Sequence, residues 1–222
     1  MTLPVTTWTV AALGLLAYML GGIPVGLLLV RLARPSVDVR SLGTGNIGTA
    51  NIYRNVDAGL AVAVGPLQFL QGFLPVLLAG HVGMPAPVVG LCAVCAVIGN
   101  GWPVYVGFHG GRGIAVATGA VAAMSPVGLL ALLACYGLGV LAREIAMGVL
   151  AGFVLLPLVG ALVVGKAYAA IFAALLVLVL LRRLEGALTD ARRDRRPWRM
   201  LARRLARDQR PGRPLVGRRT DG

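Results

Sequence analysis

Acidic and metal-binding side chains are scarce in this chain. Among its 222 residues there are eight aspartates and glutamates, two histidines and three cysteines, and strong charges account for only 13%. Hydrophobic residues account for 58%. A water-soluble domain of this size needs a more polar surface, so the composition excludes that class and indicates an integral membrane protein.

The same scarcity excludes several kinds of reactive centre. Cys92 and Cys95 form a C-x-x-C pair inside an apolar run that has no charged or histidine partner, and Cys135 is isolated. We expect these cysteines to pack rather than to form a disulfide framework or a metal site. No serine, histidine and acid lie in a pattern that would indicate a nucleophilic triad.

Long apolar runs predict membrane-spanning helices. A span needs about 20 residues, and lipid offers no partner to an unpaired backbone group, so closed helices are expected. The apolar runs cover roughly residues 8–32, 58–80, 86–100, 114–141, 145–165 and 167–181. Residues 1–7 carry no positive charge, so we expect the first run to remain as a span rather than to be cleaved as a signal peptide.

The arginines predict the orientation and the number of spans. Fourteen of the 20 arginines lie between residues 182 and 219, which places the C-terminal tail in the cytoplasm. Arginines in the loops at 31–54 and 101–113 place both loops on the same side. Six spans would send the tail outward, so we expect the fourth run to divide at Ser125 and Pro126 into two short helices.

We therefore predict an all-α polytopic membrane protein with about seven transmembrane helices, some of them short, and glycine-rich interfacial loops on the cytoplasmic face. Residues 1–186 would form the integral membrane domain, and residues 187–222 a basic cytoplasmic tail. In this tail Trp198, Leu201 and Leu205 recur at i, i+3 and i+7 among arginines, which is typical of a helix lying on anionic lipid. The alternative is a disordered basic extension. A nucleic-acid partner is not expected, and nothing in the sequence indicates an oligomeric state.

The first polar patch lies at residues 43–54, between apolar runs. Gly43 and Gly45 let the backbone turn freely, and Asn46 is predicted to be the N-cap of a short helix that begins near Ile47. Free amides at a helix N-terminus favour an anion.

Within that predicted helix, Asn51 and Arg54 share a face with Ile47, so we expect an amide and a guanidinium to point in one direction. Arginine binds phosphate through two parallel hydrogen bonds. The alternative interpretation is an ordinary turn with an interfacial arginine.

The second polar patch repeats this pattern. Gly110, Gly111 and Gly113 flank Arg112 just before a new apolar helix, so a basic group is again expected over exposed backbone amides. Two such loops on one membrane face indicate one anionic site. His109 could act as an acid or base near neutral pH, although an interfacial histidine is more often simply solvated.

Together the two patches resemble the PlsY family, the bacterial acyl-phosphate glycerol-3-phosphate acyltransferases, over about residues 18–186. The stretch 21–31 is similar to the family's opening G-S-I-P-x-G span, and residues 38–54 match its D-I-R-x-x-G-S-G-N-I-G-A-T-N-x-x-R motif without a gap. Residues 99–116 are similar to its second motif, G-H-x-x-P-V-x-x-x-F-x-G-G-K-G-V-A-T.

The resemblance implies a seven-helix inner-membrane enzyme with a cytoplasmic active site. It implies transfer of a fatty acyl group from acyl phosphate to glycerol 3-phosphate, giving lysophosphatidic acid for phospholipid synthesis, without a metal or cofactor. By position, the catalytic residues would be Thr44, Asn46 and Arg54. The residues that bind substrate or phosphate would be Gly43, Gly45, Asn51, Gly110, Gly111, Arg112, Gly113 and Arg143.

The chain also departs from the family pattern. The first motif's threonine is Ala50, with a hydroxyl moved to Thr49, and the L-D-x-x-K-G sequence has Gln68 and Gln71 in place of its acid and its cation. The second motif's histidine is Asn100. Two other readings therefore stay open: a catalytically degenerate paralogue that binds or regulates in phospholipid synthesis, and a small transporter for an organic anion.

Overall fold

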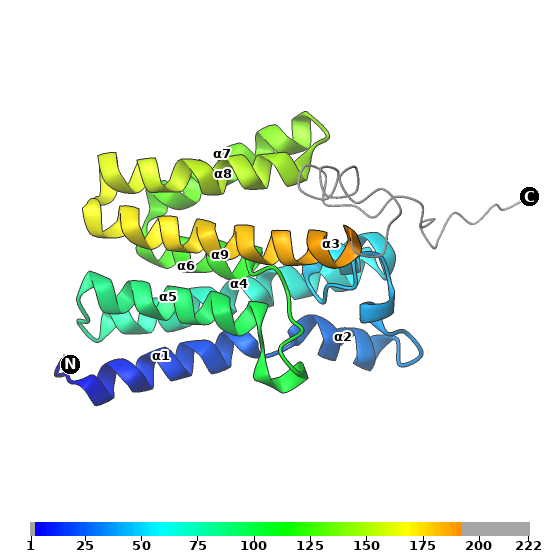
Figure 1. The fold of residues 1–222 in the computed structure, drawn as a ribbon, viewed down its shortest axis with the longest axis horizontal. Coiled ribbons are helices and arrows are strands. Elements are labelled where there is room, and N and C mark those ends of the chain that lie inside the picture. The colour runs from blue at the N-terminus through cyan, green and yellow to red at the C-terminus, as the bar shows by residue number, and fades with distance from the viewer. Residues whose placement is uncertain (1–2, 192–222) are drawn as a thin grey trace, which may run out of the picture.

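A computed structural model describes residues 3–191, and that part of the chain contains helices and loops but no strand (Figure 1). The α-helices are α1 (Thr7–Gly22), α2 (Val25–Ala33), α3 (Thr49–Asn55), α4 (Ala58–His81), α5 (Ala86–Gly101), α6 (Ile114–Met124), α7 (Pro126–Leu141), α8 (Ile145–Val159) and α9 (Lys166–Ala191). Short 3₁₀ turns cover Val39–Ser41 and Val104–Val106, and a π-helical turn covers Gly160–Val164.

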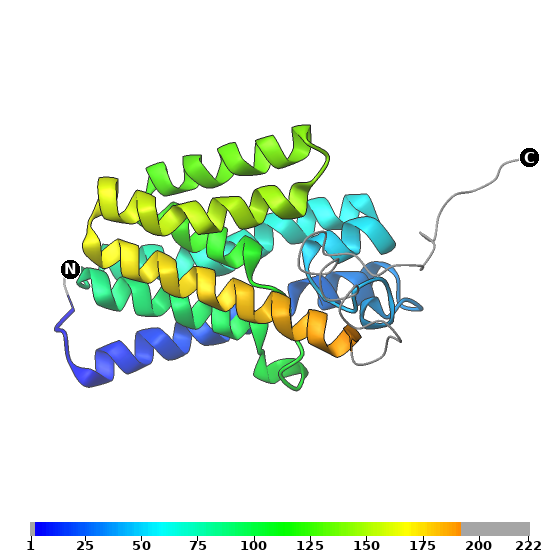
Figure 2. The same ribbon diagram turned by 45° about the horizontal axis from the view of Figure 1, so that its top comes forward.

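The long helices run side by side in one bundle, and the start of α1 and the end of α9 lie at opposite ends (Figures 1 and 2). Within residues 3–191, five segments are long and apolar enough to cross a membrane, and α6 and α7 are shorter apolar helices. The prediction of an all-α polytopic membrane protein with about seven spans, two of them short, is confirmed.

The predicted division of the fourth run is also confirmed. Helix α6 ends at Met124 and α7 begins at Pro126. Between them Ser125 caps α7, because its hydroxyl oxygen accepts a hydrogen bond of 3.0 Å from the amide of Gly128. A proline at the first helical position needs no hydrogen-bond acceptor, so it opens the new helix without loss.

The continuous hydropathy of the first apolar run suggested one helix, but the structure has two. The run divides at Ile23 and Pro24 into α1 and α2. Proline lacks an amide proton and so interrupts the ladder. The buried side chain of Gln71 on α4 stabilises the break, since its Nε2 donates to the carbonyl oxygens of Leu20 at 2.7 Å and Ile23 at 2.8 Å.

Glycines bring the helices into close contact. A methyl group at Gly72 of α4 would overlap the carbonyl oxygen of Val116 on α6, and one at Gly119 of α6 would overlap the carbonyl oxygen of Phe69 on α4. This reciprocal contact lets the two backbones touch, as small residues commonly do between membrane helices. Similar contacts join α1 to α5 and α7 to α8.

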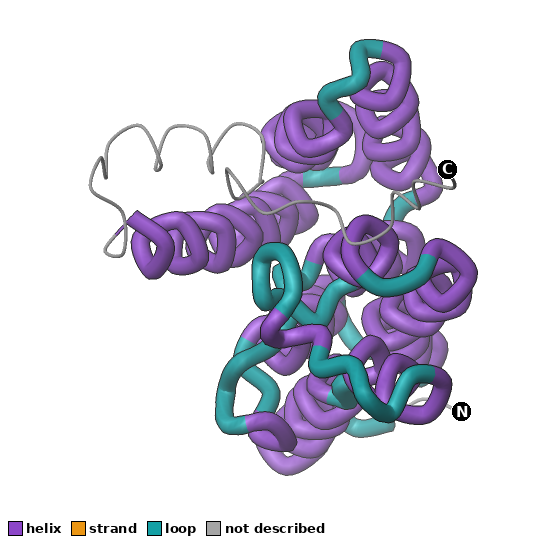
Figure 3. Tube along the Cα trace, turned by 90° about the vertical axis from the view of Figure 1, so that its right-hand side faces the viewer, coloured by secondary structure: helices purple, strands orange, loops and turns teal. Residues whose placement is uncertain are grey.

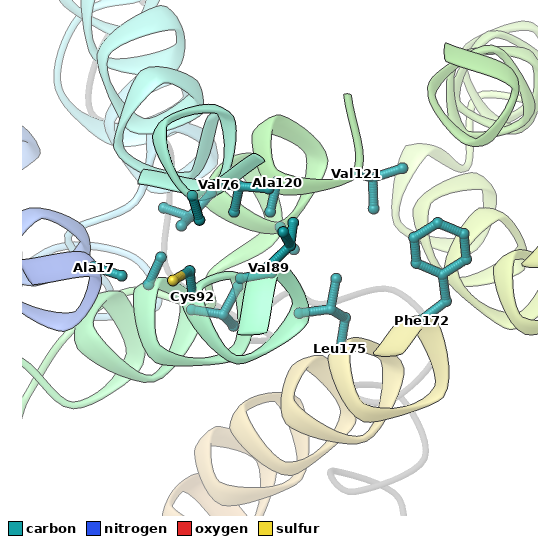
Figure 4. Close-up of a cluster of buried hydrophobic side chains, with 14 of the residues drawn as sticks. Ala17, Val76, Val89, Cys92, Ala120, Val121, Phe172 and Leu175 are labelled. Atoms are coloured by element: carbon teal, nitrogen blue, oxygen red, sulfur yellow. The ribbon is translucent and has the colours of Figure 1, made fainter. Parts of the chain in front are cut away.

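The main core lies between α4, α5, α6 and α9 (Figure 4). Val76, Ala120 and Leu175 are fully or almost fully buried there, together with Cys92. Burial of Cys92 among apolar side chains confirms the packing interpretation of this cysteine.

The end of α9 bears on the predicted domain division. Helix α9 continues without interruption through Gly186 to Ala191, across the boundary drawn after residue 186. The division itself stays a prediction. The amphipathic pattern of Trp198, Leu201 and Leu205 lies outside the described residues.

We predict that Gly119→Ala destabilises the protein by about 1–3 kcal/mol, because the added methyl overpacks the contact with α4. Gly137→Ala is the matched control, since Gly137 lies within α7 and has nothing within 4 Å of an added methyl. The control should be neutral or slightly stabilising, because alanine favours helix over glycine by up to about 1 kcal/mol. Thermal unfolding in one detergent measures both, and equal stability of the two variants would contradict the prediction.

Candidate active site

The first glycine loop is held together by one buried amide. The side chain of Asn51 is 5% exposed. Its Nδ2 donates to the carbonyl oxygens of Asn46 at 2.8 Å and Leu42 at 3.2 Å, and its Oδ1 accepts from the amide of Thr44 at 3.0 Å. The Asn51 amide therefore points into the loop. The sequence had predicted that it would point in one direction with Arg54. Its direct contact with a substrate stays a prediction.

The predicted N-cap is wrong. Helix α3 begins at Thr49 with Gly48 as its N-cap, and Asn46 instead accepts a hydrogen bond of 2.8 Å from the amide of Gly48. Ile47 lies outside the helix, because its apolar side chain is buried against α2 and its carbonyl oxygen abuts Gly26. Burial of Ile47 thus delays the helix by two residues.

The glycines of this loop turn as predicted. Gly43 and Gly45 have φ angles of +51° and +74°, a region that side chains with a Cβ rarely adopt. A methyl group at Gly43 would also collide with the side chains of Asn51 and Asn55. The sharp turn therefore requires glycine, and it carries Thr44 past the buried amide of Asn51.

The second glycine loop does not present free amides, contrary to prediction. The amide of Gly110 donates to the carbonyl oxygen of Gly101 at 3.2 Å, and that of Gly111 to the carbonyl oxygen of Asn100 at 2.8 Å. The amide of Gly113 donates to Oδ1 of Asn100 at 3.1 Å. The loop folds back over the end of α5, and this contact uses the donors that were expected to bind an anion.

Arg182 on α9 fixes the same loop from its other side. Its guanidinium donates to the carbonyl oxygens of Gly111 at 3.0 Å and Gly110 at 3.1 Å and lies 4.9 Å from the ring centre of Trp102. Glu185 pairs with it one turn further on. Sequence reasoning counted Arg182 among the tail arginines and missed this role, although it stands at the end of an apolar run.

Two loop carboxylates have arginine partners, and of these Asp38 is exposed and Asp57 is half-buried. The amide of Leu60 holds the pKa of Asp57 below its ordinary value, and Arg34 adds to this through a 2.8 Å ion pair. Arg40 lowers the pKa of Asp38 in the same direction, mainly through a side-chain hydrogen bond. Asp38 therefore stabilises the loop, and Asp57 stabilises the start of α4.

Both glycine patches contribute to the lining of one cavity of about 750 Å³. One of the elements that line it, α3, lies toward the end of the bundle that faces the viewer in Figure 3. Helix α3 and the starts of α4, α6 and α8 contribute to its wall. The predicted site residues that line it are Gly43, Thr44, Asn46, Asn51, Arg54, Arg112 and Gly113. Those of the prediction that do not line it are Gly45, Gly110, Gly111 and Arg143.

The cavity has a positive wall. Arg54 and Arg112 both line it, and among residues 3–191 its lining contains no aspartate or glutamate. Such an arrangement favours an anionic ligand, because each guanidinium offers a fork of donors that matches a phosphate.

Arg143 and His109 are not brought to this cavity. Arg143 occupies the turn before α8 in a left-handed conformation with φ of +56°, although Ile145 and Val149 just beyond it do line the cavity. His109 is exposed, and its Nδ1 contacts the carbonyl oxygen of Gly107. The solvated interpretation of His109 agrees with this placement.

Sequence reasoning missed a hydrogen-bonded pair in the wall of the cavity. The hydroxyl of Thr49 donates to Oε1 of Gln68 at 2.9 Å, and both residues line the cavity. In the sequence Gln68 was only a departure from a motif. Its place facing a cavity depends on α3 lying against α4, which the local sequence does not indicate.

An apolar groove adjoins the cavity. It has a volume of about 460 Å³ and is lined by residues of α4, α6 and α7, among them Pro66, Phe69 and Tyr136. Ile114 and Ala115 line both the groove and the cavity. A cavity lined by two arginines thus continues into an apolar groove.

The family can now be established. The family model described as glycerol-3-phosphate acyltransferase matches residues 11–189. The chain belongs to this family. A glycerol-3-phosphate acyltransferase of Geobacter sulfurreducens is 36% identical over 143 residues, which cover 64% of this chain and 73% of that protein.

Solved structures of a glycerol-3-phosphate acyltransferase share the fold. The crystal structure of the integral membrane enzyme PlsY in its glycerol 3-phosphate form has a TM-score of 0.73 at 28% identity, covering 85% of this chain and 95% of that one. The lysophosphatidic acid form has a TM-score of 0.72 at 27% identity, covering 87% of this chain and 99% of that one.

We predict that Arg182→Ala loosens the second glycine loop, because each lost hydrogen bond from a charged group is worth about 1.5–3 kcal/mol. Arg182→Lys should restore only part of the stability, since an ammonium lacks the planar fork. Amide hydrogen exchange of residues 107–113 and the thermal midpoint measure the effect. The control is Arg34→Ala, which removes an exposed ion pair worth about 0–1 kcal/mol. If both alanine variants exchange alike in this loop, the assigned role of Arg182 is wrong.

Proposed function

We propose that this chain transfers a fatty acyl group from acyl phosphate to glycerol 3-phosphate, giving lysophosphatidic acid and phosphate. The observation that carries the proposal is the continuity between the cavity lined by Arg54 and Arg112 and the apolar groove, through Ile114 and Ala115. Membership of the glycerol-3-phosphate acyltransferase family supports the acceptor. The glycerol 3-phosphate and lysophosphatidic acid forms of PlsY support acceptor and product.

The two arginines would hold phosphate groups, and positive charge would be the main catalytic device. Acyl phosphate and glycerol 3-phosphate are both anions, and their repulsion opposes the encounter in water. Guanidinium groups fixed in a partly apolar cavity offset this repulsion and stabilise the charge that develops as phosphate departs.

Thr44 and Asn46 would contact the polar acceptor. Both line the cavity, and the Thr44 hydroxyl and the Asn46 Nδ2 make no hydrogen bond to other residues in the described part of the chain. Hydrogen bonds from these groups to a hydroxyl would fix its direction of approach, which is a large part of catalysis between two bound reactants.

We predict that Arg54→Ala and Arg112→Ala each weaken glycerol 3-phosphate binding by roughly 10- to 150-fold, since a lost charge-assisted hydrogen bond is worth about 1.5–3 kcal/mol. Arg54→Lys should recover part of the affinity. Arg40→Ala is the control, because Arg40 pairs with Asp38 and does not line the cavity. The measurement is the KM for labelled glycerol 3-phosphate with acyl phosphate as donor. An unchanged KM in either cavity variant would contradict the shared phosphate site.

Transport is the outcome that would replace this proposal. Purified protein that forms no lysophosphatidic acid but accumulates glycerol 3-phosphate inside sealed vesicles would favour the organic-anion transporter. Binding of both substrates without turnover would favour the degenerate paralogue.

The proposal includes an orientation in the cell inner membrane. The arginines at 31–54, at 101–113 and in the tail favour the cytoplasm for the end of the bundle that holds the cavity. On that side the basic residues 192–222 would meet anionic lipid, whose attraction is about 1 kcal/mol per basic residue near the surface.

We predict that an impermeant thiol reagent outside intact cells does not modify a cysteine placed at Ser41 or Thr220, in a background without Cys92, Cys95 and Cys135. After lysis both positions should react. The Thr220 position should react more slowly in anionic membranes than in detergent, because lipid covers the tail. External labelling of either position would overturn the orientation.

A further inference from the structure

One buried glutamine lies where the cavity and the apolar groove meet. On α4, Gly65, Pro66 and Phe69 line the groove, whereas Gln68 between them lines the cavity. Gln68 is ten residues beyond the first residue of α4, which is roughly 15 Å along the helix. It therefore lies well inside the bundle, in the wall of the cavity.

Thr49 fixes the direction of this carboxamide. The Thr49 hydroxyl donates to Oε1 of Gln68 at 2.9 Å, so Nε2 keeps both protons. The Gln68 side chain is 5% exposed, and within residues 3–188 its Nε2 makes no hydrogen bond. The methyl group of Thr49 also packs close to Gly65, which holds the pair in place. An amide donor that faces a cavity and has no protein partner among residues 3–188 is expected to bond to water or to a ligand there.

The substrates bring an oxygen to this place. In an acyl phosphate only one bond separates the phosphate oxygen from the carbonyl carbon. With the phosphate in the arginine-lined cavity and the acyl chain in the groove, the carbonyl lies at the shared wall formed by Ile114 and Ala115. Gln68 lines the same cavity from α4.

We propose that Gln68 is a catalytic residue whose Nε2 donates a hydrogen bond to the acyl carbonyl oxygen as it becomes an oxyanion, with Thr49 as the positioning residue. This inference rests on the proposed function. The acceptor hydroxyl oxygen bonds to the carbonyl carbon, and the bond from that carbon to the phosphate oxygen breaks. The hydroxyl proton leaves on the departing phosphate, so charge and atoms balance without a further reactant.

Gln68 is preferred to the other cavity donors because of where the charge develops. The arginines stand near the phosphates, and Thr44 and Asn46 belong to the first glycine loop. A donor directed at the carbonyl oxygen strengthens its hydrogen bond only as the negative charge forms, and so lowers the barrier rather than tightening substrate binding.

The test is steady-state kinetics of the purified full-length protein with acyl phosphate and labelled glycerol 3-phosphate. Gln68→Ala should lower kcat by about 10²- to 10³-fold, as loss of one such donor does in other acyl transfers. Both KM values should stay within about twofold, because the interaction is made only in the transition state. Gln68→Glu should lose at least as much, since it keeps the shape, removes the donor and adds negative charge.

Variants of Thr49 provide a second, independent test. Thr49→Val should lower kcat by less than Gln68→Ala, and Thr49→Ser should restore it, because serine keeps the hydroxyl that directs the carboxamide. The matched control is Leu67→Ala, which truncates an exposed side chain on the same turn of α4 and should leave kcat unchanged. Thermal midpoints show that each variant is folded.

The failures can be told apart. A wild type that forms no lysophosphatidic acid overturns the proposed function and this inference with it. An active wild type whose Gln68→Ala and Gln68→Glu variants keep kcat overturns the inference alone. Loss of substrate affinity in place of kcat would also overturn it, because it would show Gln68 to be a structural or binding residue.

Discussion

Every backbone group that leaves a helix inside this bundle must find a partner in the protein, because lipid supplies none. Three buried side-chain amides provide these partners. Asn51 holds the first glycine loop, Asn100 holds the second, and Gln71 satisfies the break between α1 and α2. An amide suits this task because it carries a donor and an acceptor without a charge that would have to be desolvated. Asn51 and Asn100 also line the cavity, so two of these contacts shape its wall.

Several arginines among the described residues differ in their surroundings. Arg34, Arg40 and Arg182 each form an ion pair with a carboxylate, and these pairs stabilise the structure. Arg54 and Arg112 line the cavity and contribute positive charge to its wall. Asp38 and Asp57 stabilise a loop and the start of α4.

Apolar runs, proline positions and turn glycines predicted much of the fold, because they act through local geometry. The division at Pro126 and the positive φ angles of Gly43 and Gly45 are examples. The sequence could not show which backbone amides the tertiary structure would use. The donors of Gly110, Gly111 and Gly113 appeared free, but Asn100 and Gly101 lie beneath them.

Only part of the site could be predicted, because the sequence does not show which helices pack together. The motifs predicted Thr44, Asn46, Arg54 and Arg112 as site residues, and all four line one cavity. Each of them lies in a loop or at a helix end. Gln68 was absent from the prediction because it lies mid-helix, in a run whose pattern indicates only a membrane span. Arg182 was absent because charge counting assigned it to the tail. Both depend on which helices pack together, and that information is spread over the whole chain.

The wall shared by the cavity and the groove, Ile114 and Ala115, separates a polar lining with two arginines from an apolar one. A water-soluble reactant can reach one side of it and a membrane-dissolved reactant the other, without either having to enter the phase that excludes it. The products part in the same way, one into the aqueous compartment and one sideways into the leaflet. Their dilution into separate phases removes each from the other and draws the reaction forward. The start of α6, which carries Ile114 and Ala115, thereby couples the reaction to the partitioning of its products.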